Sequence, residues 1–198
     1  DLEKKPGGKP ILLTPYLKSL PRVFVNGMER RFINGIGYGI DGYCCEKGDE
    51  LRGKGNGEVN YTAIAIKGLL FHYKPTGATI TVDGVEHRFE KVWLAPTMIG
   101  RYYGGGMMPT PEQDRLNGDG AGSVMVYYGS GKLKSLAVFP SIFKGEHIKY
   151  SEMVAVLSGR NITVCFDEPR PLQIDGETVP GVREYSVTAC EEKVLQPA

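Results

Sequence analysis

A carboxylate on a tight turn is the residue arrangement in this chain with the clearest chemical potential. Asp175-Gly176-Glu177 places a glutamate directly after an Asp-Gly pair, and Asp-Gly is a strong signal for a two-residue hairpin turn. A carboxylate that a rigid turn aims in one direction can serve as a general base for an arriving hydroxyl group. The spacing alone also fits an ordinary hairpin turn with an exposed glutamate, so both interpretations stay open.

Two glycine-rich stretches are candidate binding segments. Tyr102 to Met107 contains three consecutive glycines, which let a backbone approach a ligand closely, although a long surface loop has the same composition. Gly37 to Gly42 matches the Gly-x-Gly-x-x-Gly pattern of dinucleotide-binding folds, but such a site needs a helix that opens at the third glycine. Residues 43–57 lack a helical pattern and are expected to form a charged, mobile loop. We therefore predict a glycine-kinked strand in place of a nucleotide site.

The sequence lacks the common metal and nucleophile motifs. The three histidines, His72, His87 and His147, are far apart and make no ligand cluster. Asp114 to Asp119 is similar to a calcium loop, but Leu116 stands where an oxygen ligand belongs. The chain contains neither the Gly-x-x-x-x-Gly-Lys-Ser/Thr phosphate loop nor the Gly-x-Ser-x-Gly elbow of hydrolases.

The elements that must position these residues are mostly short strands. Asn26-Gly27 and Asp83-Gly84 predict two hairpins, over residues 22–33 and 78–89. Further strands are expected at residues 91–95, 124–128, 153–157, 161–166, 171–174, and 178–179 with 183–188. A longer helix is expected from Glu58 to Lys74, capped by Asn60, and a short one from Leu133 to Phe143. About ten strands need a second layer to bury their inner faces, so we predict a mainly β fold, a β-sandwich with one longer and one short helix inserted.

Composition agrees with a folded, β-rich domain and gives no sign of a nucleic-acid partner. Lys+Arg and Asp+Glu number 24 and 23, so the formal net charge is only +1. Glycine supplies 27 of the 198 residues, which suits many turns. The four cysteines have no metal-ligand spacing and are expected to be reduced, buried thiols of a cytoplasmic protein. Residues 1–20 are interpreted as a linker or severed interdomain segment, and residues 21–198 as the β-sandwich domain.

Five motifs follow one another along most of the chain: Phe32 to Asp41, Tyr73-Lys74-Pro75, Tyr103 to Met107 with Pro111 and Asp119-Gly120, Phe143 to His147, and Asp175-Gly176-Glu177. Together, in this order, they resemble the C-terminal half of the bacterial diacylglycerol kinase and sphingosine kinase family of lipid kinases. Each motif alone is unspecific, whereas their order is typical of that family. The second domain of the family is a β-sandwich, which agrees with the strand pattern.

The resemblance implies a reaction and a set of site residues. The family transfers the γ-phosphoryl group of ATP to a lipid hydroxyl, and Glu177 stands at the position of its general base. The family also carries Mg²⁺, which the carboxylate of Asp119 and the carbonyls of Leu116 and Ala121 would hold here. ATP would be bound mainly by a first domain, whose Gly-Gly-Asp-Gly-Thr motif this sequence lacks. No cofactor-binding residue is assigned, and the chain is expected to be part of a longer kinase and inactive alone.

Two functions of different classes stay open. The first is the lipid-substrate half of an ATP-dependent, diacylglycerol kinase-like enzyme in the cytoplasm, peripheral at the membrane surface. Its partners would be a lipid substrate and ATP, with no nucleic acid, and homodimer formation is left open. The alternative is a non-catalytic lipid-binding or regulatory β-sandwich that kept the pocket and lost catalysis. The intact Asp175-Gly176-Glu177 favours the first, and the identity of the lipid stays open.

Overall fold

The computed structural model describes residues 19–54, 59–115 and 120–190. Strands make up most of this part of the chain. Their bounds are β1 Arg22–Val25, β2 Met28–Arg31, β3 Gly35–Tyr38, β4 Thr76–Val82, β5 Val85–Val92, β6 Thr97–Met98, β7 Gly122–Tyr127, β8 Val154–Gly159, β9 Asn161–Ile174 and β10 Glu177–Thr188. The α-helices are α2 Ile40–Gly53, α3 Tyr61–Lys67 and α4 Lys132–Val138. The π-helix η1 Gly68–His72 continues α3, and the 3-10 helices η2 Phe139–Lys144 and η3 Glu146–Lys149 come after α4.

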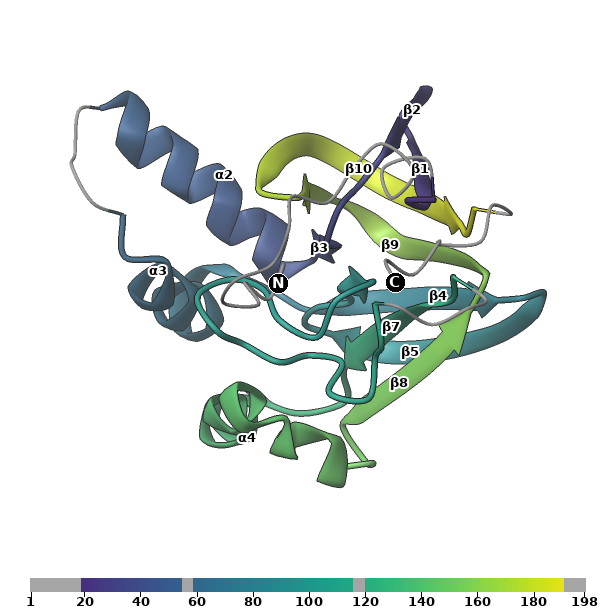
Figure 1. Ribbon diagram of the computed structural model, residues 1–198. Helices are drawn as coiled ribbons and strands as arrows, with labels where there is room; N and C mark the ends of the chain where they lie inside the picture. The colour runs from purple at the N-terminus through teal and green to yellow at the C-terminus, as the bar shows by residue number, and fades with distance from the viewer. Residues whose placement is uncertain (1–18, 55–58, 116–119, 191–198) are drawn as a thin grey trace, which may run out of the picture.

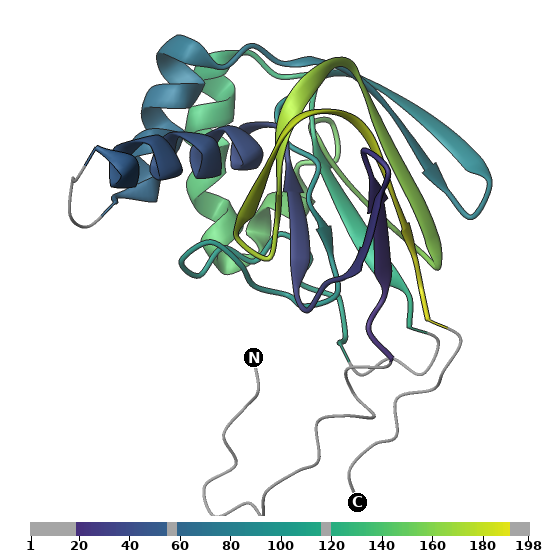
Figure 2. The ribbon, with the colours of Figure 1, turned by 90° about the horizontal axis from the view of Figure 1, so that it is seen from above.

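The strands join into one antiparallel network that forms two layers. Their order is β2-β1-β10-β9-β3-β6-β7-β8, with β4 and β5 attached at β9. Strand β9 belongs to both layers, because its residues 162–166 pair with β4 and its residues 172–174 pair with β3. The helices gather on one side of the strands (Figures 1 and 2). The mainly β fold predicted from the strand pattern is thus confirmed.

The three predicted turns that contain Asn-Gly or Asp-Gly are all present. In each, the residues flanking the turn pair directly: Val25 with Met28, Val82 with Val85, and Ile174 with Glu177. The first turn residues, Asn26, Asp83 and Asp175, have φ values of 48, 47 and 50°. Positive φ at both turn positions is the type I′ geometry, whose twist matches that of the strands.

Two hydrophobic cores fill the space between the layers and beneath the helices. Strand β7 is buried along its whole length, and because side chains alternate along a strand, it contributes to both cores. Val124 and Val126 face the core between the sheet layers, whereas Met125 and Tyr127 face the core under the helices. Trp93, the largest fully buried side chain, belongs to the second core.

The expectation of a mobile loop over residues 43–57 was wrong for its described part. Residues Ile40–Gly53 form helix α2, the longest helix of the described chain. Its buried face consists of Ile40, Gly42, Cys44 and Gly48, of which only Ile40 is large and apolar, so the sequence shows no apolar periodicity. Gly42 lies so close to β9 that an added Cβ would stand 1.8 Å from the carbonyl oxygen of Pro171. The stripe of small residues therefore serves close packing.

Helix α2 also changes the reason for rejecting a nucleotide site at Gly37 to Gly42. A strand, β3, precedes the helix, as a dinucleotide fingerprint requires. However, β3 pairs antiparallel with both of its neighbours, so there is no parallel βαβ unit. The third glycine, Gly42, is inside the helix and packed on β9. Of the stretch from Gly37 to Gly42 that was predicted to be a strand, only Gly37 and Tyr38 lie in β3, and Ile40 to Gly42 are helical.

The other predicted elements differ mainly in their boundaries. Asn60 caps α3 as predicted, with its side chain accepting from the Ala63 N–H at 3.0 Å, but the helix becomes a π-helix at Gly68. The expected strand at residues 91–95 is instead the end of β5 followed by isolated bridges from Leu94 to Gly39 and to Tyr127. The two strands expected at 161–166 and 171–174 are the single strand β9.

Three further expectations concern the chain ends, the cysteines and the membrane. Leu20 is buried in the first core, and residues 1–18 of the proposed linker lie outside the described residues. The four cysteines form no disulfide, but only Cys44 is fully buried. Within the described ranges, every helix is too short or too polar to cross a bilayer.

Candidate functional site

The Asp175-Gly176 turn is fixed by its own aspartate. The Asp175 carboxylate accepts hydrogen bonds from three successive backbone N–H groups, those of Ile33 at 2.6 Å, Asn34 at 2.9 Å and Gly35 at 3.1 Å. The Asp175 N–H in turn donates to the Gly35 carbonyl at 3.0 Å. The β9–β10 hairpin is thereby attached to the segment that leads into β3, and the residue that follows the turn inherits this fixed position.

Glu177 is the first residue of β10, and its side chain is 73% exposed. Its carboxylate forms an ion pair with the guanidinium of Arg30 on β2. The same guanidinium donates a long hydrogen bond of 3.4 Å to the Ile174 carbonyl. The pair thus lies across the turn, and Arg30 holds one oxygen of the predicted general base. Sequence reasoning missed Arg30, because its contact with Glu177 spans almost the whole chain.

Asn34 connects the turn to two further segments of the site. Its side-chain N–H donates to the Tyr102 carbonyl at 2.9 Å, and its side-chain oxygen accepts from Arg115 at 2.6 Å. Arg115 also donates to the Ile33 carbonyl at 2.6 Å. The glycine loop and Arg115, in the loop that follows it, therefore both contact the segment that binds the Asp175 turn.

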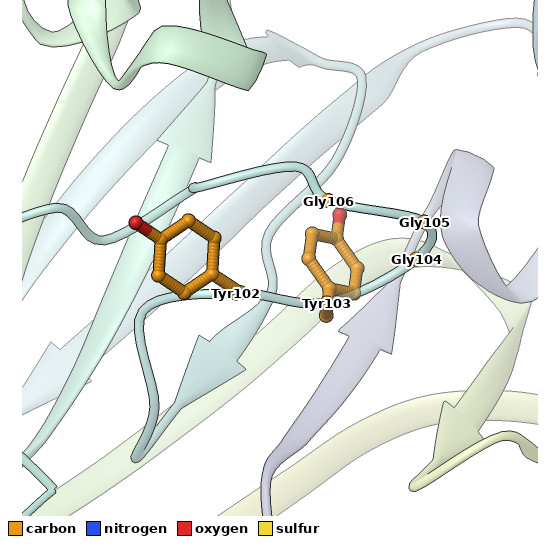
Figure 3. A pocket seen from close by; sticks show the side chains of 5 residues that line it. All are labelled: Tyr102, Tyr103, Gly104, Gly105 and Gly106. Atoms are coloured by element: carbon orange, nitrogen blue, oxygen red, sulfur yellow. The ribbon is translucent and has the colours of Figure 1, made fainter. Parts of the chain in front are cut away.

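The glycine loop forms a tight reversal in front of α2. The N–H and carbonyl groups of Tyr103 and Met107 pair at 3.0 Å, and Gly104, Gly105 and Gly106 between them have φ values of 51, 81 and 104°. Only glycine adopts three such conformations in succession without strain. An open hollow of about 510 Å³ lies at this loop. In Figure 3 the ring of Tyr103 stands at the glycine turn, while that of Tyr102 points away from it.

Tyr103 closes the loop onto the first turn of α2. Its hydroxyl donates to the carboxylate of Asp41 at 2.5 Å. Burial raises the pKa of Asp41 to about 7, and the hydrogen bond from Tyr103 opposes this rise only in part. Asp41 belongs to the glycine pattern and to the motif from Phe32 to Asp41, but neither predicts its hydrogen bond with Tyr103.

A cavity of about 560 Å³ lies beside these groups, between α2, α3, η2 and the glycine loop. Part of its wall comes from residues of the site itself, namely Asn34, Gly35, Asp175 and Gly176. The remaining wall is largely apolar and comes from the helices, including Ile40, Ala65, Phe139 and Phe143. Its volume is typical of small-molecule sites. An apolar chamber therefore ends at the turn that carries Glu177.

Two cysteines complete the chamber wall. Cys44 and Cys45 both line the cavity, and burial raises the pKa of the Cys45 thiol to about 11 and that of Cys44 further. Both thiols stay protonated at neutral pH, so they serve as apolar lining and not as nucleophiles.

The predicted magnesium ligands are only partly described. Asp119 and Leu116 lie outside the described residues. The Ala121 carbonyl accepts a hydrogen bond of 2.8 Å from the buried side chain of Gln113. Within the described ranges, no group of three or more His, Cys, Asp or Glu side chains could hold a metal ion. The magnesium site stays a prediction.

The motif from Phe143 to His147 has a structural role in the described fold. The ring of His147 is fully buried, and its Nε2 lies 2.9 Å from the Pro109 carbonyl. Burial lowers the pKa of His147, so the ring is neutral at physiological pH. The histidine thus anchors the segment that follows the glycine loop.

Residues 34–191 match the protein family described as the YegS C-terminal NAD kinase beta sandwich-like domain. The match covers most of the chain and all of the site except Arg30 and Ile33. The chain belongs to this family. The resemblance inferred from the ordered motifs is thereby confirmed, and so is the β-sandwich architecture of the YegS-type domain.

Relatives of this YegS-type domain carry the name diacylglycerol kinase. Two from Mycobacterium tuberculosis, strains CDC 1551 / Oshkosh and ATCC 25618 / H37Rv, are each 29% identical over 174 residues. The alignment covers 87% of this chain and 54% of each relative, so the chain spans about half the length of the curated relatives it matches. These names support membership in a kinase family.

Solved structures from Bacillus anthracis str. Sterne share the fold. One putative diacylglycerol kinase has a TM-score of 0.58 at 16% identity, over 90% of this chain and 57% of its own. Another has a TM-score of 0.54 at 17% identity, over 86% of this chain and 53% of its own. At such identities the likeness concerns the fold alone.

Proposed function

We propose that this YegS-type domain is the lipid-substrate half of an ATP-dependent, diacylglycerol kinase-like enzyme. One observation carries the proposal: a largely apolar cavity of about 560 Å³ reaches the Asp175-Gly176 turn, directly before Glu177. A lipid with its acyl chains among the helices would present its polar end at this turn. The names of the relatives agree with such a substrate.

Glu177 would act as the general base for the lipid hydroxyl. One carboxylate oxygen pairs with Arg30, and the side chain is exposed enough for the other oxygen to accept a proton. As the proton passes to Glu177, the lipid oxygen forms its bond to the γ-phosphorus of ATP, and the bond to the β,γ-bridging oxygen breaks to release ADP. The three N–H groups bound to Asp175 keep this base in place while the substrate approaches.

ATP and Mg²⁺ enter this proposal from outside the described residues. A nucleotide-binding domain would supply the phosphate contacts, since the sequence has no motif of that kind. Mg²⁺ bound by Asp119, Leu116 and Ala121 would neutralise negative charge on the phosphate groups of ATP. It would do so at the loop that follows Arg115. Arg115 already connects that loop to Asn34 at the turn, which supports a role of the loop near the reacting groups.

The experiment that tests the proposal fills the cavity. Ala65→Phe places a ring in the chamber wall, and it should weaken binding of a water-soluble, short-chain diacylglycerol by about tenfold or more, as expected when an apolar site of this size is blocked. Isothermal titration calorimetry below the micelle concentration measures this affinity. Ala137→Phe on the exposed face of α4 is the matched control and should bind like the unchanged chain. Lipid binding that is equal in both variants would contradict the proposal.

The non-catalytic alternative uses the same cavity. A regulatory lipid-binding domain would need the chamber but not the carboxylate of Glu177. The fixed geometry of the Asp175 turn and the Arg30 pair favour the enzyme, because lipid binding alone gives no reason to orient an exposed glutamate.

A further inference from the structure

The two most exposed large apolar side chains of the described chain lie on neighbouring helical segments. Leu133 of α4 is 81% exposed and Phe71 of η1 is 72% exposed. Helices α4 and η1 contact each other, and in Figures 1 and 2 they lie on the same side of the molecule. Ile66 on α3, directly before η1, is 41% exposed. We call the surface formed by Ile66, Phe71 and Leu133 with their flanking lysines the α3–α4 face.

The helical segments of this face contribute only basic charged side chains, and the acidic partner nearby, Glu152, comes from outside them. Residues 60–82 and 120–145, which contain α3, η1, α4 and η2, include no aspartate or glutamate. They contain five lysines: Lys67, Lys74, Lys132, Lys134 and Lys144. The whole chain carries a net charge of only +1, so the positive charge is concentrated here. Lys134 pairs with Glu152 at 3.0 Å, but both side chains are more than half exposed and the pair is weak.

Exposed apolar side chains among lysines are typical of a surface that contacts anionic lipids. Apolar side chains on such a surface enter the boundary between headgroups and acyl chains, while lysines contact lipid phosphates. A protein partner would need acidic side chains to match the lysines and pockets to receive two isolated apolar residues. The charge pattern favours the lipid surface, which offers both features without a specific shape.

The face is continuous with the cavity. The walls of the chamber include Tyr61 and Ala65 of α3, and Phe139 and Phe143 of η2. A bilayer on the α3–α4 face would therefore lie against the helices that enclose the chamber.

We propose that the α3–α4 face docks this protein on an anionic bilayer, with Phe71 and Leu133 inserted below the headgroups. The role of the bilayer as the source of substrate rests on the proposed function, whereas docking itself does not require it. A lipid drawn from the bilayer would pass between α3 and η2 into the chamber.

Flotation of the 198-residue chain with vesicles tests the docking. Vesicles of phosphatidylcholine with phosphatidylglycerol should bind the chain, and pure phosphatidylcholine vesicles should bind it much less. Phe71→Ser with Leu133→Ser should lower the partition coefficient by about tenfold or more. Lys67→Gln with Lys132→Gln should also weaken binding and reduce its sensitivity to salt. All four positions are exposed, and an unchanged melting temperature will show that the variants fold.

Matched controls lie elsewhere on the surface. Val85 is 59% exposed at the tip of the β4–β5 hairpin, which projects on the other side of the molecule, and Val85→Ser should bind like the unchanged chain. Lys54→Gln with Lys149→Gln removes two exposed lysines outside the face and should have a smaller effect than the face variant. Absence of binding to anionic vesicles, or equal losses in face and control variants, would overturn the proposal. A concentration-dependent dimer that Phe71→Ser with Leu133→Ser abolishes, without vesicle binding, would assign the face to a second copy instead.

Calorimetry with the short-chain lipid separates this proposal from the proposed function. Loss of vesicle binding with intact chamber binding refutes the docking face alone. Intact, face-dependent vesicle binding without any chamber binding refutes the lipid-substrate function and leaves the docking face standing.

Discussion

Within Asp175-Gly176-Glu177 the two carboxylates have different tasks. The carboxylate oxygens of Asp175 accept hydrogen bonds from three backbone N–H groups. The carboxylate of Glu177 is exposed and forms one ion pair. The same use of an aspartate recurs at the other Asp-Gly hairpin, where Asp83 accepts from the N–H groups of Arg160 and Asn161. Those hydrogen bonds lower the pKa of Asp83. An Asp-Gly turn in this fold is therefore also an anchor to a neighbouring segment.

The predicted base can be tested by an isosteric change. Glu177→Gln, in the kinase that joins this chain to a nucleotide-binding domain, should lower kcat by about 10²–10⁴, because an amide cannot accept the hydroxyl proton. Lipid and ATP affinities should change little, since the lost interaction belongs to the transition state. Glu86→Gln, close to the Asp83-Gly84 turn, should behave like the unchanged enzyme. Steady-state kinetics measure kcat for both variants. Equally small effects of the two substitutions on kcat would show that Glu177 is only a turn residue.

The anchoring aspartates offer a second matched pair. Asp175→Asn replaces a charged acceptor of three N–H groups by a neutral one. It should lower the free energy of unfolding by about 1–3 kcal/mol, and it should also lower kcat. Asp83→Asn should lower stability by about 1 kcal/mol but leave kcat unchanged, because its turn lies away from the cavity lining. Urea unfolding and initial rates measure the two effects. A kcat loss of the same size in both variants would show that Asp175 has no specific part in positioning Glu177.

At the scale of elements, α2 depends on glycine where it touches β9. Gly42→Ala would place a methyl group 1.8 Å from the Pro171 carbonyl oxygen, so the helix must move, at a cost of about 1–3 kcal/mol or more. Gly53→Ala, at the exposed end of the same helix, meets nothing within 4 Å and should be neutral or stabilise by up to about 1 kcal/mol. Thermal unfolding of both variants compares the two sites, and equal shifts would contradict the packing argument.

The contact between α2 and the glycine loop predicts a pH dependence. The folded state raises the pKa of Asp41 from 3.8 to about 7, so between these values it binds more protons than the unfolded state. The Asp41 contribution to the free energy of unfolding is therefore fully present below pH 4 and is lost as the pH rises to about 7. Urea unfolding over this range should show the decline, and Asp41→Asn should remove it. Asp49→Asn on the same helix is the control, and a decline that persists in Asp41→Asn would assign it to another group.

Local signals explain which elements the sequence predicts correctly. The turns at Asn26, Asp83 and Asp175 follow from adjacent residues, because positive φ at two positions selects a few residue types. Helix α2 gives no such signal, since its buried stripe of Ile40, Cys44 and Gly48 lacks apolar bulk. In the site, too, only local patterns could be predicted from the sequence, such as the motif that contains Asp175 and Glu177. The Arg30–Glu177 and Asp41–Tyr103 contacts could not be predicted, because they form only when distant segments meet.

At the scale of the whole molecule, the 198-residue chain should not transfer phosphate by itself. Phosphoryl transfer needs a cradle for the triphosphate, and the sequence contains no phosphate-binding loop. The N-terminus of α2 cannot serve instead, because its first turn carries the Asp41 carboxyl. Incubation with ATP, Mg²⁺ and a panel of lipids should give no product above a heat-treated control. Product formation that Glu177→Gln abolishes would show that the chain binds ATP unaided.

Pairing between the two ends of the domain governs the order in which the chain can fold. Strand β1 lies against β10, with Val23 opposite Val187, and β9 must be in place before β3 and β4 have their second strand partner. During synthesis the first hairpin therefore leaves the ribosome with an open edge and waits for the last strand. Both sheet layers close only when β9 and β10 have emerged, so folding of this domain depends on contacts between distant residues. A stop codon before β10 would leave β1 and β9 as unpaired edges, so truncation near the end of this domain should produce aggregation instead of a smaller folded protein.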